Sequence, residues 1–277
     1  MSPRLIPMLA LVKDTFREAF ARKIFWGFAG CCTALLAFLV FIMRIDVVAG
    51  ALATITIFGR AMPTTDVQGL VQQTQSVIAM SMYFFGMALS VFASAGLVAA
   101  VFEPGRIELL LSKPVSRTQI LLGRYIGNLA VVAANILYLT FGSWIIFGIK
   151  TGLWGGGYLL SSLFTIFVFG VLLALIVLIG VLWESAAVAI MATFGIMIVT
   201  PILAQRATIE RLLSADWSRD LVTVFYYILP KTSDISVIIR HLILNEPVDS
   251  WMPVWSTALF VAVVLAAGIL HFRRRSF

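Results

Sequence analysis

Residues 158–203 read YLLSSLFTIFVFGVLLALIVLIGVLWESAAVAIMATFGIMIVTPIL, and Glu184 is the only charged residue among them. A membrane-spanning helix needs about 20 apolar residues, so this stretch is too long for one span. A carboxylate in the middle of a bilayer is costly. We therefore divide the stretch at Trp183–Glu184–Ser185 and predict two spans joined by a tight hairpin.

The rest of the chain has the same apolar character. Of its 277 residues 61% are hydrophobic and 12% are charged, with a mean hydropathy of +1.03, whereas soluble domains average about 25% charged residues. The composition predicts an all-α polytopic membrane protein with six transmembrane helices. The six apolar blocks cover residues 24–43, 78–101, 121–149, 158–182, 185–203 and 255–271.

The distribution of basic residues predicts the orientation. With six spans both chain ends lie on one side, and that side holds twelve of the twenty basic residues on the shorter loops. Basic residues close to spans favour the cytoplasm. We therefore expect cytoplasmic termini, attribute the net charge of +7 to topology and expect no nucleic-acid partner. The twelve are Arg4, Lys13, Arg17, Arg22, Lys23, Arg106, Lys113, Arg117, Arg124, Arg273, Arg274 and Arg275.

Residues 4–23 have the pattern of an amphipathic helix. An apolar arc and a charged remainder are typical of a helix that lies in the membrane interface and contacts lipid headgroups. The alternative is a helix that continues the first span into water. The apolar arc consists of Leu5, Leu9, Val12, Phe16 and Phe20.

Two polar segments are expected on the external side. In residues 44–77 the sequence MPTTD indicates a turn, and the polar stretch VQGLVQQTQS could extend the second helix outward. Residues 204–254 contain two apolar pieces, 221–229 and 235–244, that are too short to span, and Pro230 ends the first. We predict two short helices there.

The segment EPGRIELLLSKPVSRTQILLGRY, residues 103–125, connects the second and third blocks. Proline and glycine break the preceding helix, a short helix follows, and Ser116 with Gln119 forms a capping box for the next helix. Gly123 and Gly127 form a small-xxx-small pair that lets another helix approach closely. The alternative interpretation is that residues 103–125 are an ordinary loop between two well-capped helices.

This segment resembles the cytoplasmic loop of type-2 ABC exporter permeases, also called type V. That loop carries a glutamate, then a glycine, then the run E-x-L-L-S-x-P-V-S-R-x-x-I-L-L-G-K/R-Y. The whole chain is similar to the subfamily that includes the permease of the nitrous-oxide-reductase maturation transporter. The resemblance covers the six-span layout, the helix at 4–23 and the loop. The loop is specific, whereas the spans are generic apolar helix.

The resemblance implies that residues 1–277 form one permease domain in a bacterial inner membrane. It implies a partnership with a second copy of the chain, two cytoplasmic ABC ATPase subunits and membrane lipid. Residues 4–23 would be an interfacial elbow and 103–120 a cytoplasmic coupling segment. ATP and magnesium would bind to the partner subunit, and this chain would bind no cofactor. It places five residues in or beside the coupling element: Glu103, Arg106, Glu108, Lys113 and Arg117.

The sequence gives less support to other classes of function, namely a self-contained pump and an intramembrane enzyme. It contains no Walker A loop, no H-E-x-x-H and no G-x-S-x-G string, and the adjacent Cys31 and Cys32 suit packing better than a disulfide or a metal site. A scaffold without transport activity remains an alternative, as does delivery of a copper or sulfur precursor for metalloenzyme maturation.

The interiors of the spans hold hydroxyls and amides and no charged groups, which argues against ion-coupled transport. We expect most of these side chains to make helix–helix contacts, and a cargo that is amphipathic or a small molecule. Cargo-lining residues stay unassigned. The polar residues within the spans are Thr33, Ser90, Ser94, Asn128, Asn135, Thr140, Ser161, Ser162, Thr165 and Thr193.

Overall fold

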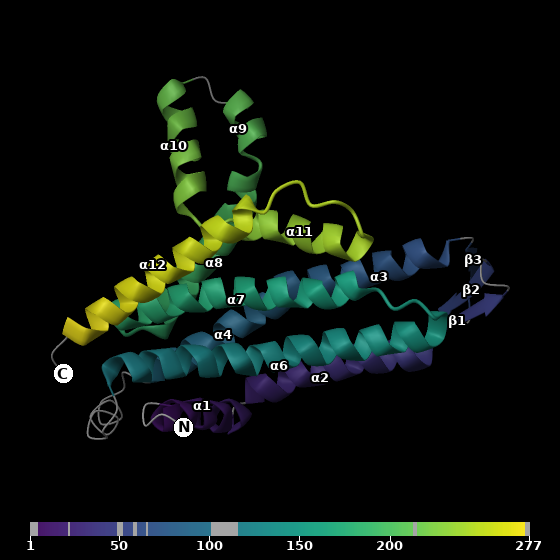
Figure 1. The fold of residues 1–277 in the computed structure, drawn as a ribbon, viewed down its shortest axis with the longest axis horizontal. Helices are drawn as coiled ribbons and strands as arrows, with labels where there is room; N and C mark the ends of the chain where they lie inside the picture. Colours follow the sequence, from purple (N-terminus) through teal and green to yellow (C-terminus); the bar gives the residue numbers. More distant parts are fainter. Residues whose placement is uncertain are drawn as a thin grey trace.

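The computed structural model describes residues 5–21, 23–48, 52–57, 60–64, 66–100, 116–212 and 215–274. Within these ranges the chain is an elongated bundle of long helices with a small sheet at one end (Figure 1). A helix occupies each of the six apolar blocks. These are α2 (Lys23–Ala37) with its π-helical continuation η1 (Phe38–Ile42), the run of α3 (Val67–Ser81), η2 (Met82–Gly86) and α4 (Met87–Ala99), then α6 (Arg117–Thr151), α7 (Gly156–Trp183), α8 (Ala186–Ala204) and α12 (Met252–Arg274).

Length and hydropathy make this a multi-pass membrane protein. Among the described residues, five helices are long and apolar enough to cross a bilayer: Val67–Ala99, α6, α7, α8 and α12. Two further pairs pass the same test together, but each is sharply bent. α1 (Leu5–Ala21) and α2 meet at 72°, and α10 (Asp216–Ile228) and α11 (Thr232–Leu244) meet at 62°. The candidate spans therefore number five to seven.

α7 is the central helix of the bundle. It packs against α4, α6, α8, α11 and α12. Of its 18 most apolar consecutive residues 78% are buried, whereas the corresponding share is 22% for α8 and 17% for α12. A helix that is hydrophobic on all sides belongs in the interior of a bundle. In a membrane, the apolar outer faces of α8 and α12 are left for lipid or another protein.

The hairpin between α7 and α8 forms where the sequence predicted it. α7 ends at Trp183, Glu184 adopts the left-handed conformation with φ 53°, and Ser185 caps α8 by accepting a hydrogen bond from the Val188 amide. A non-glycine residue at positive φ is uncommon. One such residue and one cap reverse the chain, so the split at residues 183–185 is confirmed.

The segment between the first two apolar blocks differs from the predicted loop. Three strands form an antiparallel sheet in the order β1 (Met43–Val48), β2 (Leu52–Ile57), β3 (Arg60–Thr64). Valine, isoleucine and threonine favour strands, and the Pro63 of MPTTD lies in the edge strand β3, where proline is tolerated. α3 begins at Val67 after the cap Asp66, so the stretch VQGLVQQTQS does extend the second helix.

The segment after α8 is helical. It contains α9 (Arg206–Leu212), which the sequence did not predict, and α10 and α11, which include the two short apolar pieces. α10 ends at Ile228, just before Pro230. α9 and α10 form a hairpin that projects sideways from the bundle (Figure 1). α11 instead packs along α7 and α3.

Candidate functional site

The N-terminal helix α1 packs closely on the first half of α6. Among its described side chains, the buried ones are Leu11, Thr15 and Ala19. A Cβ added at Gly123 would lie 2.9 Å from the Cβ of Leu11, and one added at Gly127 would lie 2.7 Å from the Cβ of Thr15. Real Cβ atoms do not approach so closely. The prediction that this glycine pair lets another helix approach is confirmed, and that helix is α1.

Among the described side chains of the predicted apolar arc, Phe16 and Phe20 lie beside the face of α1 that docks on the glycine pair. Phe16 is only half-buried and Phe20 is 46% exposed, while the smaller Thr15 and Ala19 are buried. Two glycines leave room for small side chains only, so the larger Phe16 packs to one side, against Ala19, Leu97 and Val131. The partly exposed Phe20 packs on the rings of Phe25 and Trp26 at the start of α2.

A buried arginine holds α1 to α6. Arg124 donates from Nη1 to Glu18 Oε2 at 2.7 Å and from Nη2 to Asp14 Oδ2 at 3.2 Å. The Arg124 side chain is 3% exposed, whereas Glu18 is 17% and Asp14 57% exposed. A buried charge needs a hydrogen-bonded counter-charge. Glu18 is therefore the principal partner of Arg124, and Asp14 is an outer one.

Sequence reasoning counted Arg124 only as a basic residue near the cytoplasm and missed this contact. Two signals could have found it. Arg124 lies seven residues inside the helix that begins at Arg117, where an unpaired charge would be costly. Asp14 and Glu18 are four residues apart and so share one face of α1.

The start of α6 is fixed by its cap and by the end of α12. The predicted capping box is confirmed: Gln119 N donates to Ser116 Oγ at 3.2 Å, and Ser116 N donates to Gln119 Oε1 at 2.9 Å. Arg117 Nη1 donates to the carbonyl oxygens of Phe272 at 3.3 Å and Arg273 at 3.5 Å. These carbonyls belong to the last turn of α12, where a cation is favourable.

Of the predicted coupling residues, the structure places only Arg117. Glu103, Arg106, Glu108 and Lys113 lie outside the described residues, as does most of the coupling segment 103–120. Arg117 lies where the first turn of α6 meets the C-terminal end of α12, and α1 lies at this same end of the bundle (Figure 1). The helix that follows the segment is thus joined to both α1 and α12.

A second cluster of polar and aromatic side chains links α9, α10 and α11. The Arg206 guanidinium lies 4.1 Å and the Lys231 ammonium 4.8 Å from the centre of the Tyr226 ring, both within range of a cation–π contact. Burial, and next the hydrogen bond at 2.7 Å to Asp234, raise the pKa of Tyr226 to about 12. Burial lowers the pKa of Lys231. These contacts fix the angle between α10 and α11.

Among the described side chains, no group of three or more histidine, cysteine, aspartate or glutamate residues is placed to hold a metal ion. Cys31 is exposed, Cys32 is buried, and both are free thiols. The arrangement described so far suits mechanical connection between helices better than chemistry on a bound substrate.

A family profile with the description ABC-2 family transporter protein matches residues 9–277. The chain belongs to the ABC-2 transporter family. The match runs from α1 to the end of the chain, so it includes the α1–α6 contact, the long helices and the hairpin of α9 and α10. None of the curated proteins compared with the chain matches it.

Membership in this family makes the chain the membrane subunit of an ABC transporter, a permease, and implies association with an ABC ATPase subunit. Subunits of this family are generally not themselves catalytic. The candidate site is therefore the junction of α1, α6 and α12, beside the segment expected to contact that ATPase.

Proposed function

We propose that this chain is the permease of a dimeric type-2 ABC exporter, in which two separate ATPase subunits drive two copies of the chain. The observation that supports this best is the joined end of the bundle. Arg117 ties α6 to α12, and Arg124 ties α6 to α1. A push on residues 103–115 from a cytoplasmic ATPase would therefore reach three helices at once.

In this proposal six spans cross the membrane: α2, the run from α3 to α4, α6, α7, α8 and α12. α1 meets α2 at 72°, so it lies in the cytoplasmic interface with its exposed apolar face, including Phe20, in lipid. α10 has 13 residues and is about 20 Å long, too short for a hydrocarbon core of about 30 Å. α9, α10 and α11 then lie on the external side, and both termini are cytoplasmic.

The proposed coupling element consists of residues 103–120, with Glu103, Arg106, Glu108, Lys113 and Arg117 as its charged residues. The basic and acidic side chains would pair with a complementary groove of the ATPase. ATP and magnesium would bind that ATPase and not this chain.

The proposed cargo is an uncharged or amphipathic molecule that leaves the cell. The described span interiors bury hydroxyl and amide side chains such as Ser94, Asn128 and Thr193, which suit such a molecule better than a bare ion. The specific subfamily, that of the nitrous-oxide-reductase maturation permease, rests on the motif in residues 103–125. Its copper or sulfur cargo is the alternative within this proposal.

Purification of the chain from its native membrane in a mild detergent tests the proposal. We expect a stoichiometric ATPase subunit to accompany the chain, and Glu103→Lys or Glu108→Lys to release it. The matched control is Asp216→Lys on α10, whose side chain is 94% exposed and which the proposal places on the external side. Recovery of the chain with no nucleotide-binding partner, or equal loss with Asp216→Lys, would favour a scaffold that does not transport.

A further inference from the structure

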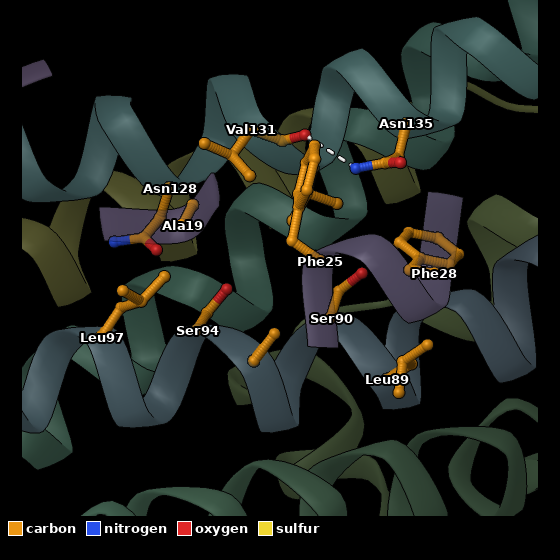
Figure 2. A pocket seen from close by; sticks show the side chains of 12 residues that line it. Ala19, Phe25, Phe28, Leu89, Ser90, Ser94, Leu97, Asn128, Val131 and Asn135 are labelled. Atoms are coloured by element: carbon orange, nitrogen blue, oxygen red, sulfur yellow. Dashed lines mark hydrogen bonds between the residues drawn. The ribbon is translucent and has the colours of Figure 1, made fainter. Parts of the chain in front are cut away.

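Two pockets of the bundle differ in size. The pocket shown in Figure 2, between α1, α2, α4 and α6, has a volume of about 30 Å³, which is room for about one water molecule. A second pocket lies at the end of the bundle that carries the sheet (Figure 1) and has a volume of about 210 Å³. Sites for drug-sized ligands measure about 300–1,000 Å³. The second pocket therefore suits a smaller molecule, on the scale of a single ring.

Three parts of the chain form the walls of this second pocket. The start of α3 contributes Gln68, Gln72 and Gln75, the turn between α6 and α7 contributes Trp154, and the end of α11 contributes Asn245. None of its described lining residues is charged. We call it the amide pocket, after its four carboxamide side chains.

Close packing holds the walls of the amide pocket in place. Asn245 ends α11 in the left-handed conformation, with φ 57°. A Cβ added at Gly157, in the first turn of α7, would collide with the Leu242 carbonyl oxygen and lie 3.5 Å from Asn245 Oδ1. The centre of the Trp154 indole lies 4.7 Å from that of Trp144. The pocket is thus formed in advance of any ligand, as is usual for small-molecule sites.

Within the described part of the chain, the four amides make no side-chain hydrogen bonds. Gln68 and Asn245 are exposed and Gln72 is half-buried, so water reaches these three. Gln75 differs, because it is 2% exposed and its Nε2 is buried without an acceptor. A buried amide group without a partner is uncommon in folded proteins. Gln75 therefore leaves an unused donor in the wall of the pocket.

We propose that the amide pocket binds one ring of a neutral polyhydroxylated molecule, either a free sugar or the sugar headgroup of a glycolipid. A carboxamide has two N–H donors and a carbonyl acceptor, and a hydroxyl group both donates and accepts, so the two kinds of group match. A charged ligand would lose hydration without gaining a counter-charge. An aliphatic ligand would leave the amides desolvated and unpaired. Trp154 is 51% exposed, which leaves indole surface for the C–H face of a sugar ring.

A bound ring would contact three parts of the chain at once. α3 already packs on α11, and the ligand would add contacts from both helices to the turn between α6 and α7. Occupancy would therefore stabilise the packing at this end of the bundle. The site needs only one subunit and no ATPase, so it stands whether or not the transport proposal holds.

Photolabelling of the full-length chain in nanodiscs of phosphatidylethanolamine and phosphatidylglycerol tests the site. The probes are methyl glucoside and methyl galactoside, each carrying a diazirine, and the unlabelled sugars compete. Diazirine-labelled cyclohexane, which has a ring without hydroxyl groups, is the control probe. We expect saturable labelling by at least one sugar probe of peptides that include residues 68–75 and 153–155, and no saturable labelling by the control probe.

Gln75→Met keeps the length of the side chain and removes an amide that makes no hydrogen bond within the described part of the chain. It should raise the half-saturating concentration of the sugar probe about three- to tenfold, the effect of one neutral hydrogen bond. Gln73→Met is the matched control, because Gln73 is exposed and lines a different groove with Ser76 and Arg240. It should leave half-saturation unchanged. Gln72→Trp puts a large ring at a half-buried position of the wall and should abolish saturable labelling, so it serves if Gln75→Met does not fold.

A second arm of the experiment distinguishes the two sources of the sugar. Competition by a glycosyl diacylglycerol in the nanodisc, at concentrations where the free sugar has no effect, would identify a lipid headgroup. Competition by the free sugar alone would identify a soluble ligand. Equal labelling by the hydroxyl-free probe, equal effects of Gln75→Met and Gln73→Met, or no saturable labelling by either sugar probe would each overturn the proposal, the last indicating a pocket that holds water only.

Discussion

Neutralising the partners of Arg124 one at a time separates the buried contact between α1 and α6 from the exposed one. Arg124 is 3% exposed and Glu18 17% exposed, and their atoms are 2.7 Å apart. Hydrogen bonds to charged groups contribute about 1.5–3 kcal/mol, so we expect Glu18→Gln to lower the free energy of unfolding by about 2 kcal/mol. Asp14 is 57% exposed, and an exposed pair is worth about 0.2–1 kcal/mol.

Removing the cation is expected to cost more than removing either acid. Arg124→Met removes the buried cation bonded to the largely buried Glu18 carboxylate, and breaking a buried ion pair costs about 3–5 kcal/mol. We expect the lower end because Glu18 keeps some exposure to solvent. Combining Arg124→Met with Glu18→Gln should recover about 2 kcal/mol of that loss, since residue 18 then no longer carries the charge that Arg124 balanced.

The assay is reversible unfolding in mixed micelles of dodecylmaltoside and SDS, followed by tryptophan fluorescence, with hydrogen exchange in α1 as a local readout. The double-mutant cycle isolates the interaction energy between Arg124 and Glu18, because the other contacts of Glu18 cancel in the comparison. Asp14→Asn is the matched control on the same helix and with the same partner. A cost for Asp14→Asn equal to that of Glu18→Gln, or a coupling energy below about 0.5 kcal/mol, would refute the assignment of Glu18 as the principal partner.

Three further predictions concern the free energy of unfolding. Gly127→Ala should cost about 1–3 kcal/mol, because the added Cβ meets Thr15 and α1 must move. The control Gly195→Ala adds a Cβ in open space and should be neutral or stabilising by up to about 1 kcal/mol. An equal loss of stability in both variants would contradict the close approach of α1. Gly152→Ala, at φ 74° in open space, should cost about 1 kcal/mol from backbone strain alone, with no comparable loss in the control Gly156→Ala. The pKa of Tyr226 is raised to about 12 in the folded chain. The wild type should therefore be more stable than Tyr226→Phe below pH 10 and should lose this extra stability as the pH rises to 12. If alkaline unfolding titrations show the extra stability growing over this range, the assigned direction of the pKa shift is wrong.

Local features of the sequence determined much of the fold. Apolar runs of sufficient length predicted the long helices, and one carboxylate predicted the hairpin at Glu184. The capping box at Ser116 and the close approach at Gly123 and Gly127 were also predictable, because each depends on residues within one or two turns of a helix. The sheet of residues 43–64 was missed because a proline-containing turn signal was given more weight than the β-branched residues around it.

The tertiary structure alone decided which surfaces meet. In a chain this apolar, the face of a helix that contacts lipid looks much like the face that contacts another helix, so periodicity does not assign partners. Only the packing places Glu18 against Arg124, the α12 carbonyls against Arg117, and Ser94 and Asn128 in the wall of one pocket (Figure 2). Each of these contacts joins residues that are distant in the chain, and the burial that makes it matter exists only once the helices have come together.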